Sequence, residues 1–277
     1  MFAPETARQI EIQGSRLNAY DIGQGPVVVL GSSFLWDAHM WAPQAEALSK
    51  THRVIVPELW GHGGSGPMPA GTTDLAALAR QNLELLDQLG VERFTLIGLS
   101  AGGMWGAELA MLAPERMSAL VLMDTSLAAE PEATRSRYFA MLGAVEAMGV
   151  LPPPVLEATV PLFFSPTVAE RKPELPAAFA ARLRDWPSAR LTDSVVPLGR
   201  LIFGRRDALA DLGKLTLPTL VITGADDVAR PPAEGREMAE RLNTRFVEVA
   251  QAGHISTLEQ PELVTRMLVE FLAEHGV

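Results

Sequence analysis

The sequence predicts an α/β fold in which a mostly parallel sheet is flanked by helices and interrupted by a helical insertion. Two apolar runs, VVVL at 27–30 and LVLM at 120–123, are continuous, as in strands that are buried on both faces of a parallel sheet. Short runs of this kind alternate with amphipathic helical patterns, and this alternation favours parallel strands joined by right-handed crossovers. The segment from 127 to 207 is instead helical and punctuated by prolines. We therefore predict an α/β core over residues 1–126 and 208–277, and a helical cap over 127–207.

Eight strands and the helices between them make up the predicted core. The strands are Arg8–Ile12, Leu17–Ile22, Val27–Leu30, Arg53–Val56, Phe94–Ile97, Leu120–Met123, 217–223 and 244–250, and helices follow the last two strands over 231–242 and 261–276. Between the fourth and fifth strands, the segment 72–90 has the period of an amphipathic helix. Thr72 or Thr73 can cap this helix, and Gly90 can end it.

The composition is that of a globular protein with a substantial core. Of the 277 residues, 48% are hydrophobic and 20% are charged. The 33 acidic residues outnumber the 23 basic ones, and the formal net charge of −10 argues against a nucleic-acid partner. The chain has no cysteine, which excludes disulfides, thiolate zinc sites and cysteine nucleophiles. No apolar run approaches the ~18 residues of a membrane span and no secretory signal is visible, so we expect a cytoplasmic protein without a membrane partner.

The segment Gly98-Leu99-Ser100-Ala101-Gly102 fits the pattern G-x-S-x-G. It lies after a predicted strand and before a predicted helix, which is the context that a nucleophile elbow requires. A serine at the tip of this turn adopts a strained backbone conformation, and side chains two residues away would collide with the neighbouring strand and helix. The turn exposes the Ser100 hydroxyl above the sheet edge, where the N-terminus of the helix favours developing negative charge.

A serine nucleophile needs a base, and the base needs an acid that orients it. Two carboxylates, Asp226 and Asp227, end a late apolar strand, and His254 follows the last predicted strand. Serine, aspartate and histidine in this order, each just after a strand, are a far more specific signal than the pentapeptide alone. The pattern indicates nucleophilic catalysis by Ser100.

With these motifs the chain resembles the α/β-hydrolase superfamily over essentially its whole length. The resemblance is to the branch of serine esterases, enol-lactone hydrolases and cofactor-free haloperoxidases. It implies that Ser100 is the nucleophile and that His254, in a Gly-His motif, is the general base. In this family the acid usually stands three residues after the glycine that ends its strand. Counting from Gly224 gives Asp227, with Asp226 as the alternative.

The resemblance also implies an oxyanion hole made of two backbone N–H groups. One belongs to the residue after the nucleophile, Ala101. The other lies in the loop after the third strand, where many relatives have His-Gly-aromatic and this chain has Ser32-Ser33-Phe34. We assign Phe34 as the second donor, with Ser33 as the alternative. This variant is similar to the Asn-Ser-Leu of enol-lactone hydrolase relatives.

The loop after the fourth strand, ELWGHGGSG at 58–66, resembles the loop that the family usually writes as P-D-x-x-G-x-G-x-S. Glu58 replaces the usual aspartate. His62 in this loop could serve as a second base, but a hydrogen bond within the loop is the favoured interpretation.

Pocket residues are predicted from the loop after the third strand, from the elbow and from the first cap helix. They are Ser33, Leu35, Trp36, Leu99, Phe139 and Leu142. No metal site and no cofactor are predicted, because no trusted metal-ligand spacing, phosphate loop or dinucleotide fingerprint is present. The expected partner is a small-molecule substrate, and the sequence leaves the oligomeric state open.

The leading hypothesis is a serine hydrolase that cleaves a small, largely apolar carboxylic ester or lactone through an acyl-enzyme intermediate. Relatives with the same triad cleave C–C bonds or form peracids, so a C–C bond hydrolase and a perhydrolase are alternatives. An aminopeptidase is another, because Glu130, Glu132 and Glu146 offer carboxylates in the cap for a substrate amine. The last alternative is a non-catalytic small-molecule receptor, which would bind without multiple turnover.

Overall fold

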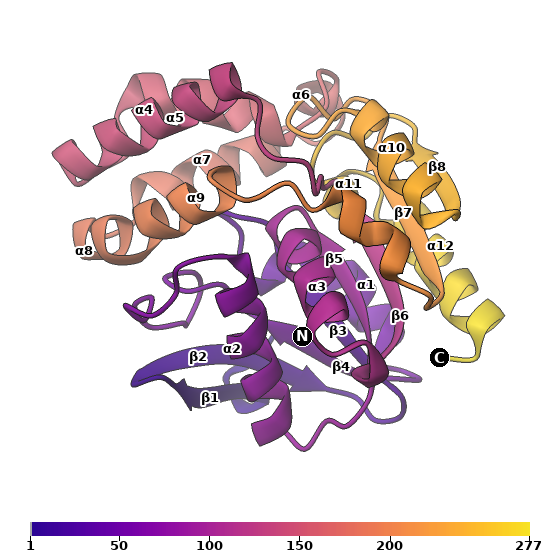
Figure 1. Cartoon of the computed structure of the whole chain (residues 1–277). Helices are drawn as coiled ribbons and strands as arrows, with labels where there is room; N and C mark the ends of the chain where they lie inside the picture. The colour runs from indigo at the N-terminus through magenta and orange to yellow at the C-terminus, as the bar shows by residue number, and fades with distance from the viewer. Residues whose placement is uncertain (1) are drawn as a thin grey trace.

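The computed structural model describes residues 2–277, and over this range eight strands form a single sheet (Figure 1). The strands are β1 (Ala7–Ile12), β2 (Ser15–Ile22), β3 (Val27–Gly31), β4 (Arg53–Pro57), β5 (Phe94–Leu99), β6 (Met117–Met123), β7 (Thr219–Gly224) and β8 (Arg245–Val249). Their order across the sheet is β1-β2-β4-β3-β5-β6-β7-β8. The pairs β1–β2 and β2–β4 are antiparallel and the other five are parallel, so the predicted mostly parallel, eight-stranded sheet is confirmed.

The strands with continuous apolar runs lie in the middle of the sheet. Every residue of β5 and all but one of β6 are buried, because helices cover both faces there. In the edge strand β1 only Ile12 is buried. The order of the strands reverses between β3 and β5, and ligands of open α/β sheets bind at the carboxyl ends of the strands that flank such a reversal. The fold therefore places the ends of β3 and β5 where a site is expected.

The helices of the core cover the two faces of the sheet. They are α1 (Ala42–Leu48), α2 (Leu75–Gln88), α3 (Ala101–Leu112), α10 (Pro232–Leu242), α11 (Ser256–Glu259) and α12 (Pro261–His275). α2 packs against α3 on one face, in front of the sheet in Figure 1, and α1 packs against α12 on the other. Within the described residues, no helix is both long and apolar enough to cross a lipid bilayer.

The start of α2 differs from the prediction. Its cap is Asp74, whose carboxylate accepts a hydrogen bond of 2.6 Å from a backbone N–H three residues later. Thr72 instead accepts a hydrogen bond from a glutamine side chain of α2. A cap at Thr72 or Thr73 is therefore wrong, because aspartate is the stronger N-cap and stands directly before the first helical residue. The predicted end is confirmed, since Gly90 has a left-handed φ of 67° just after the helix.

The chain between β6 and β7 is helical, and no strand of residues 2–277 lies within it. Its helices are α4 (Glu132–Met148), α5 (Pro153–Thr159), α6 (Val168–Arg171), α7 (Glu174–Arg184), α8 (Ser188–Arg190) and α9 (Val196–Phe203), with a 3-10 turn at Val160–Phe163 and a π-helical turn at Leu191–Val195. α4 packs against α9, and Figure 1 shows the group above the carboxyl end of the sheet. We call these helices the cap. Its predicted limits at 127 and 207 stay a prediction.

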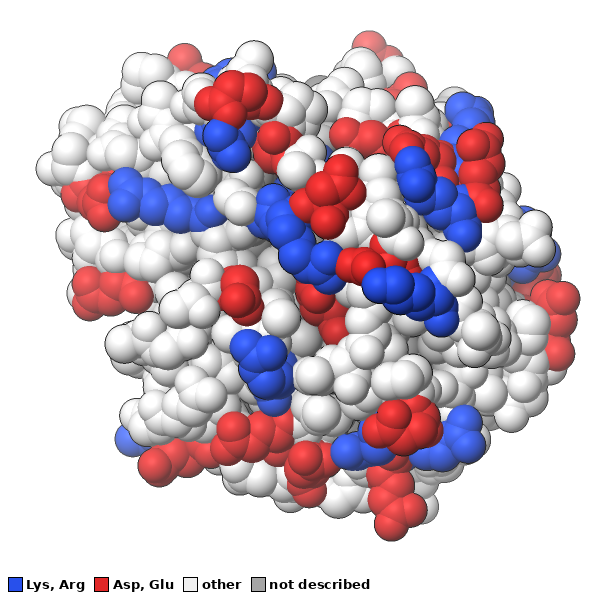
Figure 2. Space-filling view, viewed as in Figure 1, with Lys and Arg blue, Asp and Glu red and all other residues white. Residues whose placement is uncertain are grey.

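Charges of both signs are mixed on the surface. On the face shown in Figure 2, basic side chains lie beside acidic ones rather than in one basic area. Ion pairs join such side chains elsewhere on the protein too, as between Arg53 and Asp21. This face therefore carries no continuous basic patch.

Candidate active site

Ser100 lies in the tight turn between β5 and α3, with backbone angles φ 56° and ψ −117°. A positive φ at a residue other than glycine costs about 1–3 kcal/mol and persists only where the surroundings enforce it. A Cβ on Gly98 would lie 2.4 Å from the carbonyl oxygen of Gly102, and a Cβ on Gly102 would lie 2.1 Å from that of Gly31 in β3. The predicted reason for both glycines, collision with the helix and a neighbouring strand, is confirmed.

His254 and Asp227 form a buried, hydrogen-bonded pair. Nδ1 of His254 lies 2.8 Å from Oδ2 of Asp227, and Oδ1 accepts the backbone N–H groups of Ala229 and Arg230, each at 2.9 Å. An ionised carboxylate only accepts hydrogen bonds, so Nδ1 carries the proton and Nε2 is left as an acceptor. Asp226 is half-buried, and among the described residues its carboxylate makes no hydrogen bond to the imidazole. Of the two adjacent carboxylates, the structure brings Asp227 to His254.

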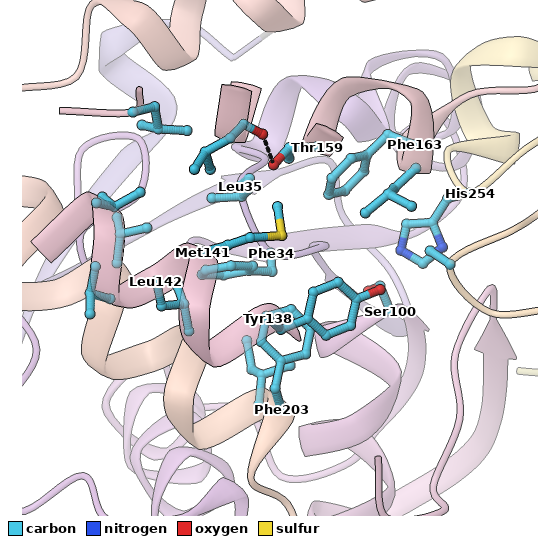
Figure 3. A pocket seen from close by; sticks show the side chains of 18 of the residues that line it. Phe34, Leu35, Ser100, Tyr138, Met141, Leu142, Thr159, Phe163, Phe203 and His254 are labelled. Carbon is cyan, nitrogen blue, oxygen red and sulfur yellow. Dashed lines mark hydrogen bonds between the residues drawn. The ribbon is translucent and has the colours of Figure 1, made fainter. Parts of the chain in front are cut away.

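Ser100 and His254 line the same cavity (Figure 3). Both lie at one end of it, whereas Leu142 of α4 lies at the other. The turn that presents the serine is fixed, because the Ser100 N–H donates to Met123 at 2.9 Å and the Ser100 carbonyl accepts from the Thr125 hydroxyl at 2.7 Å. No hydrogen bond between described residues joins Ser100 to His254. In enzymes without substrate such a bond is often long and tightens only in the complex.

The loop after β3 offers three consecutive backbone N–H groups. That of Ser33 donates to a methionine sulfur at 3.2 Å, and that of Leu35 donates to Nε2 of His62 at 3.0 Å. The N–H of Phe34 donates to no other group of residues 2–277, and Phe34 lines the cavity. Ala101 is the first residue of α3, so its N–H has no partner inside the helix. The structure thus engages the N–H of Ser33 and leaves those of Phe34 and Ala101 available.

His62 supports the loop after β3. Its buried ring donates from Nδ1 to the carbonyl oxygen of Trp60 at 2.8 Å, and Nε2 accepts the N–H of Leu35. Burial lowers the pKa of His62 to about 4, so the ring is neutral near pH 7. Because both ring nitrogens are occupied, neither is free to act as a second base. The sequence predicts the hydrogen bond within its own loop, but it carries no signal for the bond to Leu35.

The structure places a second carboxyl group, which the sequence does not predict, beside the His254–Asp227 pair. Asp124 directly follows β6 and is fully buried, with Oδ1 accepting the Gly224 N–H at 2.7 Å and Oδ2 bonded to the Ser256 hydroxyl at 2.6 Å. Burial, followed by the charge of Asp227, raises the pKa of Asp124 well above its usual range. The signal that could have found it is similar to the one used for Asp227, a carboxylate shortly after an apolar strand.

The cavity is lined mainly by apolar side chains of the cap. The space between its walls measures about 830 Å³, part of it open to solvent. The wall comes mostly from α4, α5, α9 and the turns beside them, and includes Met141, Val145, Leu151, Leu162, Val195 and Ile202. Such a wall favours a substrate with an apolar portion.

Two of the six residues predicted for the pocket line the cavity. Leu35 and Leu142 do, whereas Ser33, Trp36, Leu99 and Phe139 do not. Ser33 and Leu99 are wholly buried in the core of the protein. Trp36 is directed to another part of the cap, where it stacks on an α7 phenylalanine with ring centroids 4.6 Å apart. Ser33, Leu99 and Trp36 therefore pack inside the protein and do not contact a substrate in the cavity as predicted.

The prediction of Phe139 misses the correct position by one residue. Phe139 is 37% exposed, and its neighbour Tyr138 lines the cavity instead. Successive residues of an α-helix point about 100° apart, so a shift of one residue moves a side chain from the cavity to the surface. Tyr138 is thus a site residue that the sequence analysis does not identify.

The three cap carboxylates do not line the cavity. Glu130 is buried between two arginines, with Oε2 2.8 Å from Nη1 of Arg205 and 2.7 Å from Nη2 of Arg230. Glu132 and Glu146 each pair with an arginine at exposed positions. None of the three is available to a substrate amine in the cavity, so the aminopeptidase alternative loses the carboxylates that it requires.

Glu130, Arg205 and Arg230, which we call the Glu130 cluster, connect three parts of the chain. Glu130 precedes α4 at the start of the cap, and Arg205 follows α9 at its end. Arg230 lines the cavity and belongs to the loop whose N–H groups hold Asp227. The three side chains are only 2–4% exposed, so both guanidiniums depend on the Glu130 carboxylate for compensation, and Arg230 also pairs with Glu234 of α10 at 3.5 Å.

An open sheet with an elbow serine and a carboxylate-bound histidine is the arrangement of an α/β hydrolase, and a family model described as "alpha/beta hydrolase fold" matches residues 26–261. The chain belongs to this family and is a hydrolase. It is 31% identical to a protein of Pseudomonas savastanoi pv. phaseolicola assigned as carbamate hydrolase RutD, over 89% of this chain and 93% of the relative. It is 28% identical to 3-oxoadipate enol-lactonase 2 of Acinetobacter baylyi, with 90% of each chain covered. A thermophilic esterase from Thermogutta terrifontis has a similar structure, with a TM-score of 0.86, 28% identity and 98% of both chains covered.

Proposed function

We propose that this hydrolase cleaves a small, largely apolar carboxylic ester or lactone through an acyl-enzyme intermediate on Ser100. The observation that carries the proposal is the joint position of Ser100 and the Asp227-bound imidazole of His254 at one end of an apolar cavity. The similarity to an esterase and to an enol-lactonase supports the same class of bond.

In the first half of the reaction, Nε2 of His254 takes the hydroxyl proton of Ser100 as Oγ attacks the carbonyl carbon. Asp227 keeps the other ring proton on Nδ1 and stabilises the imidazolium that forms. The N–H groups of Phe34 and Ala101 bind the oxygen that becomes negative. The imidazolium then protonates the leaving oxygen, which belongs to the alcohol of an ester or to the ring of a lactone, and the acyl-enzyme remains.

In the second half, a water molecule attacks the acyl carbon while Nε2 of His254 takes one of its protons. The same two N–H groups bind the second tetrahedral intermediate. When this intermediate collapses, His254 returns the proton to Ser100 and the carboxylic acid leaves. The cycle consumes one water and needs no cofactor.

The cavity favours a substrate without charge. Its walls are apolar, and the guanidinium of Arg230 is bound by both carboxylate oxygens of Glu130. The enol-lactone of 3-oxoadipate carries a free carboxylate, and among the described residues that line the cavity no unpaired cation faces it. We therefore favour neutral esters and lactones over that substrate, and over the carbamates that the other relative is assigned to hydrolyse.

Hydrolysis of p-nitrophenyl acetate, butyrate and octanoate by the wild type and by Ser100→Ala tests the proposal. We expect kcat/KM to rise from acetate to butyrate, because the longer chain buries more apolar surface. Ser100→Ala should lose about 10⁴–10⁶-fold in kcat. A wild type that is no faster than the variant on all three esters would overturn the proposal. The C–C hydrolase, perhydrolase and receptor hypotheses would then come first.

The assignment of the acid is tested by two adjacent substitutions. Asp227→Asn should lower kcat on the butyrate ester by about 10⁴-fold, because the amide favours the wrong tautomer of His254. Asp226→Asn is the matched control and should change kcat by less than about threefold. Circular dichroism establishes that both variants fold. The reverse order of effects would assign the acid to Asp226.

A further inference from the structure

Five of the side chains that line the cavity carry a strongly polar group, and four of these groups already have a role or a partner. Ser100 and His254 belong to the proposed catalytic set. The hydroxyl of Thr159 donates to a backbone carbonyl one turn earlier at 2.7 Å, and the guanidinium of Arg230 is held by a buried glutamate. The hydroxyl of Tyr138 remains, and within residues 2–277 it has no hydrogen-bond partner.

Tyr138 is firmly positioned although its hydroxyl is free. The residue is only 7% exposed, and its ring stacks on Phe203 with centroids 4.2 Å apart. The guanidinium of Arg137 lies 5.2 Å from the centroid of the same ring. Phe203 in turn packs edge-on against Phe34, with centroids 5.9 Å apart, so aromatic contacts link the phenol to the loop after β3. Figure 3 shows the phenol extending from α4 toward Ser100.

The Tyr138 hydroxyl is open to the cavity rather than enclosed in the packed interior, so water can bind it, and a ligand that displaces this water has to replace its hydrogen bond. The side of Tyr138 that is open to a partner is the cavity itself. We take the partner to be uncharged, because among the described residues that line the cavity the one guanidinium, that of Arg230, is paired with Glu130. A phenol donates a hydrogen bond but does not neutralise an anion.

We propose that Tyr138 is a specificity-determining residue whose hydroxyl donates a hydrogen bond to a second substrate oxygen, outside the scissile group. The ligand class is a neutral ester or lactone that carries an ether, hydroxyl or oxo oxygen in its acyl portion. This proposal rests on the proposed hydrolase function and adds one polar requirement to an otherwise apolar cavity.

The test compares wild type and Tyr138→Phe on esters that differ only by one oxygen. The probes are p-nitrophenyl hexanoate and its three ether isosteres, the propoxyacetate, 3-ethoxypropanoate and 4-methoxybutanoate. For each probe the ratio of kcat/KM between wild type and variant is measured, so that the intrinsic reactivity of the ester cancels. We expect the ratio for at least one ether ester to exceed that for hexanoate by about tenfold, because one buried hydrogen bond is lost.

Tyr20→Phe is the matched control, because Tyr20 on β2 is the only other tyrosine of the chain and does not line the cavity. It should leave all four ratios unchanged. Ratios for Tyr138→Phe that agree within twofold across the four probes would overturn the role of Tyr138 while leaving the hydrolase intact. A wild type that cleaves none of the four esters would instead contradict the proposed function itself.

Discussion

The two halves of the candidate active site are built in different ways. In the half that the sheet contributes, backbone atoms pack directly against backbone atoms. A Cβ on Gly102, for example, would lie 2.1 Å from the carbonyl oxygen of Gly31. In the half that the cap contributes, side chains meet side chains, as where Tyr138 stacks on Phe203. Backbone contacts allow almost no substitution, whereas packed side chains can be exchanged for others of similar volume. This difference indicates that the sheet half carries the reacting groups and that the cap half determines which substrates fit.

The largest expected effect is that of Gly102→Ala in the sheet half. The added methyl group would meet backbone atoms of β3 that cannot move away without disturbing the sheet. We expect a loss of at least about 4 kcal/mol in the free energy of unfolding, measured by urea denaturation, together with loss of esterase activity. A folded, active variant with an unchanged urea midpoint would show that the elbow is not as rigid as the contacts indicate.

The second effect concerns the junction between the two halves. Glu130→Gln would leave Arg205 buried without its ion-pair partner and Arg230 with only Glu234 of α10, at 3.5 Å, so the free energy of unfolding should fall by about 3 kcal/mol. Glu132→Gln is the control, because this exposed carboxylate on α4 should contribute less than about 0.5 kcal/mol. Equal urea midpoints for the two variants would mean that the cluster does not hold the cap to the core.

A third effect depends on pH and on His62, which belongs to the sheet half. The folded protein keeps this ring neutral down to a pKa of about 4, whereas the ring in the unfolded chain is protonated below its ordinary pKa of about 6.5. The unfolded state therefore binds more protons between these values. The contribution to stability is complete above pH 6.5 and falls by roughly 3 kcal/mol as the pH decreases to 4.

Urea denaturation between pH 4 and pH 7.5 measures this dependence for the wild type and for His62→Gln. The variant should show a shallower loss of stability on acidification, and its kcat should also fall because Leu35 loses the acceptor for its N–H. Parallel pH profiles for the two proteins would show that His62 titrates as it does in water.

The smallest expected effect is that of a glycine substitution in the cap, which should stabilise the protein rather than destabilise it. A Cβ on Gly143, in α4, would meet nothing within 4 Å. Gly143→Ala should therefore raise the free energy of unfolding by about 0.5–1 kcal/mol, since alanine is the better helix former. Differential scanning calorimetry measures the rise in Tm. A decrease would indicate that α4 needs its flexibility at this position.

The difference between the sheet half and the cap half also explains which parts of the molecule can be predicted from the sequence. The strands, the elbow and the Ser100, Asp227 and His254 positions follow from local patterns, because these three residues lie one, three and five residues after the ends of β5, β7 and β8. The Glu130 cluster has no local signal, since Glu130 meets Arg205 and Arg230 at separations of 75 and 100 residues. Such contacts depend on the packing of the cap, which sequence periodicity does not specify.

The cap helices show the same limit at shorter range. In α4 apolar residues occur on all sides of the helix, so the sequence does not distinguish the face with Tyr138 from the face with Phe139. At the start of α2, three candidate caps stand in a row, and only the hydrogen bond of Asp74 decides between them. The fold class is set by patterns that many residues share, whereas these details depend on single contacts.

The Glu130 cluster also has a consequence for engineering. A cap transplanted from another α/β hydrolase would be joined to this core at two points, just after β6 and just before β7. Glu130 lies seven residues after the end of β6 and Arg205 lies two residues after the end of α9, and the Glu130 carboxylate pairs both with Arg205 and with Arg230, which stays with the core. A chimera that lost Glu130 would leave Arg205 buried without its ion-pair partner, while one that retains all three residues keeps the ion pairs that join the cap to the core.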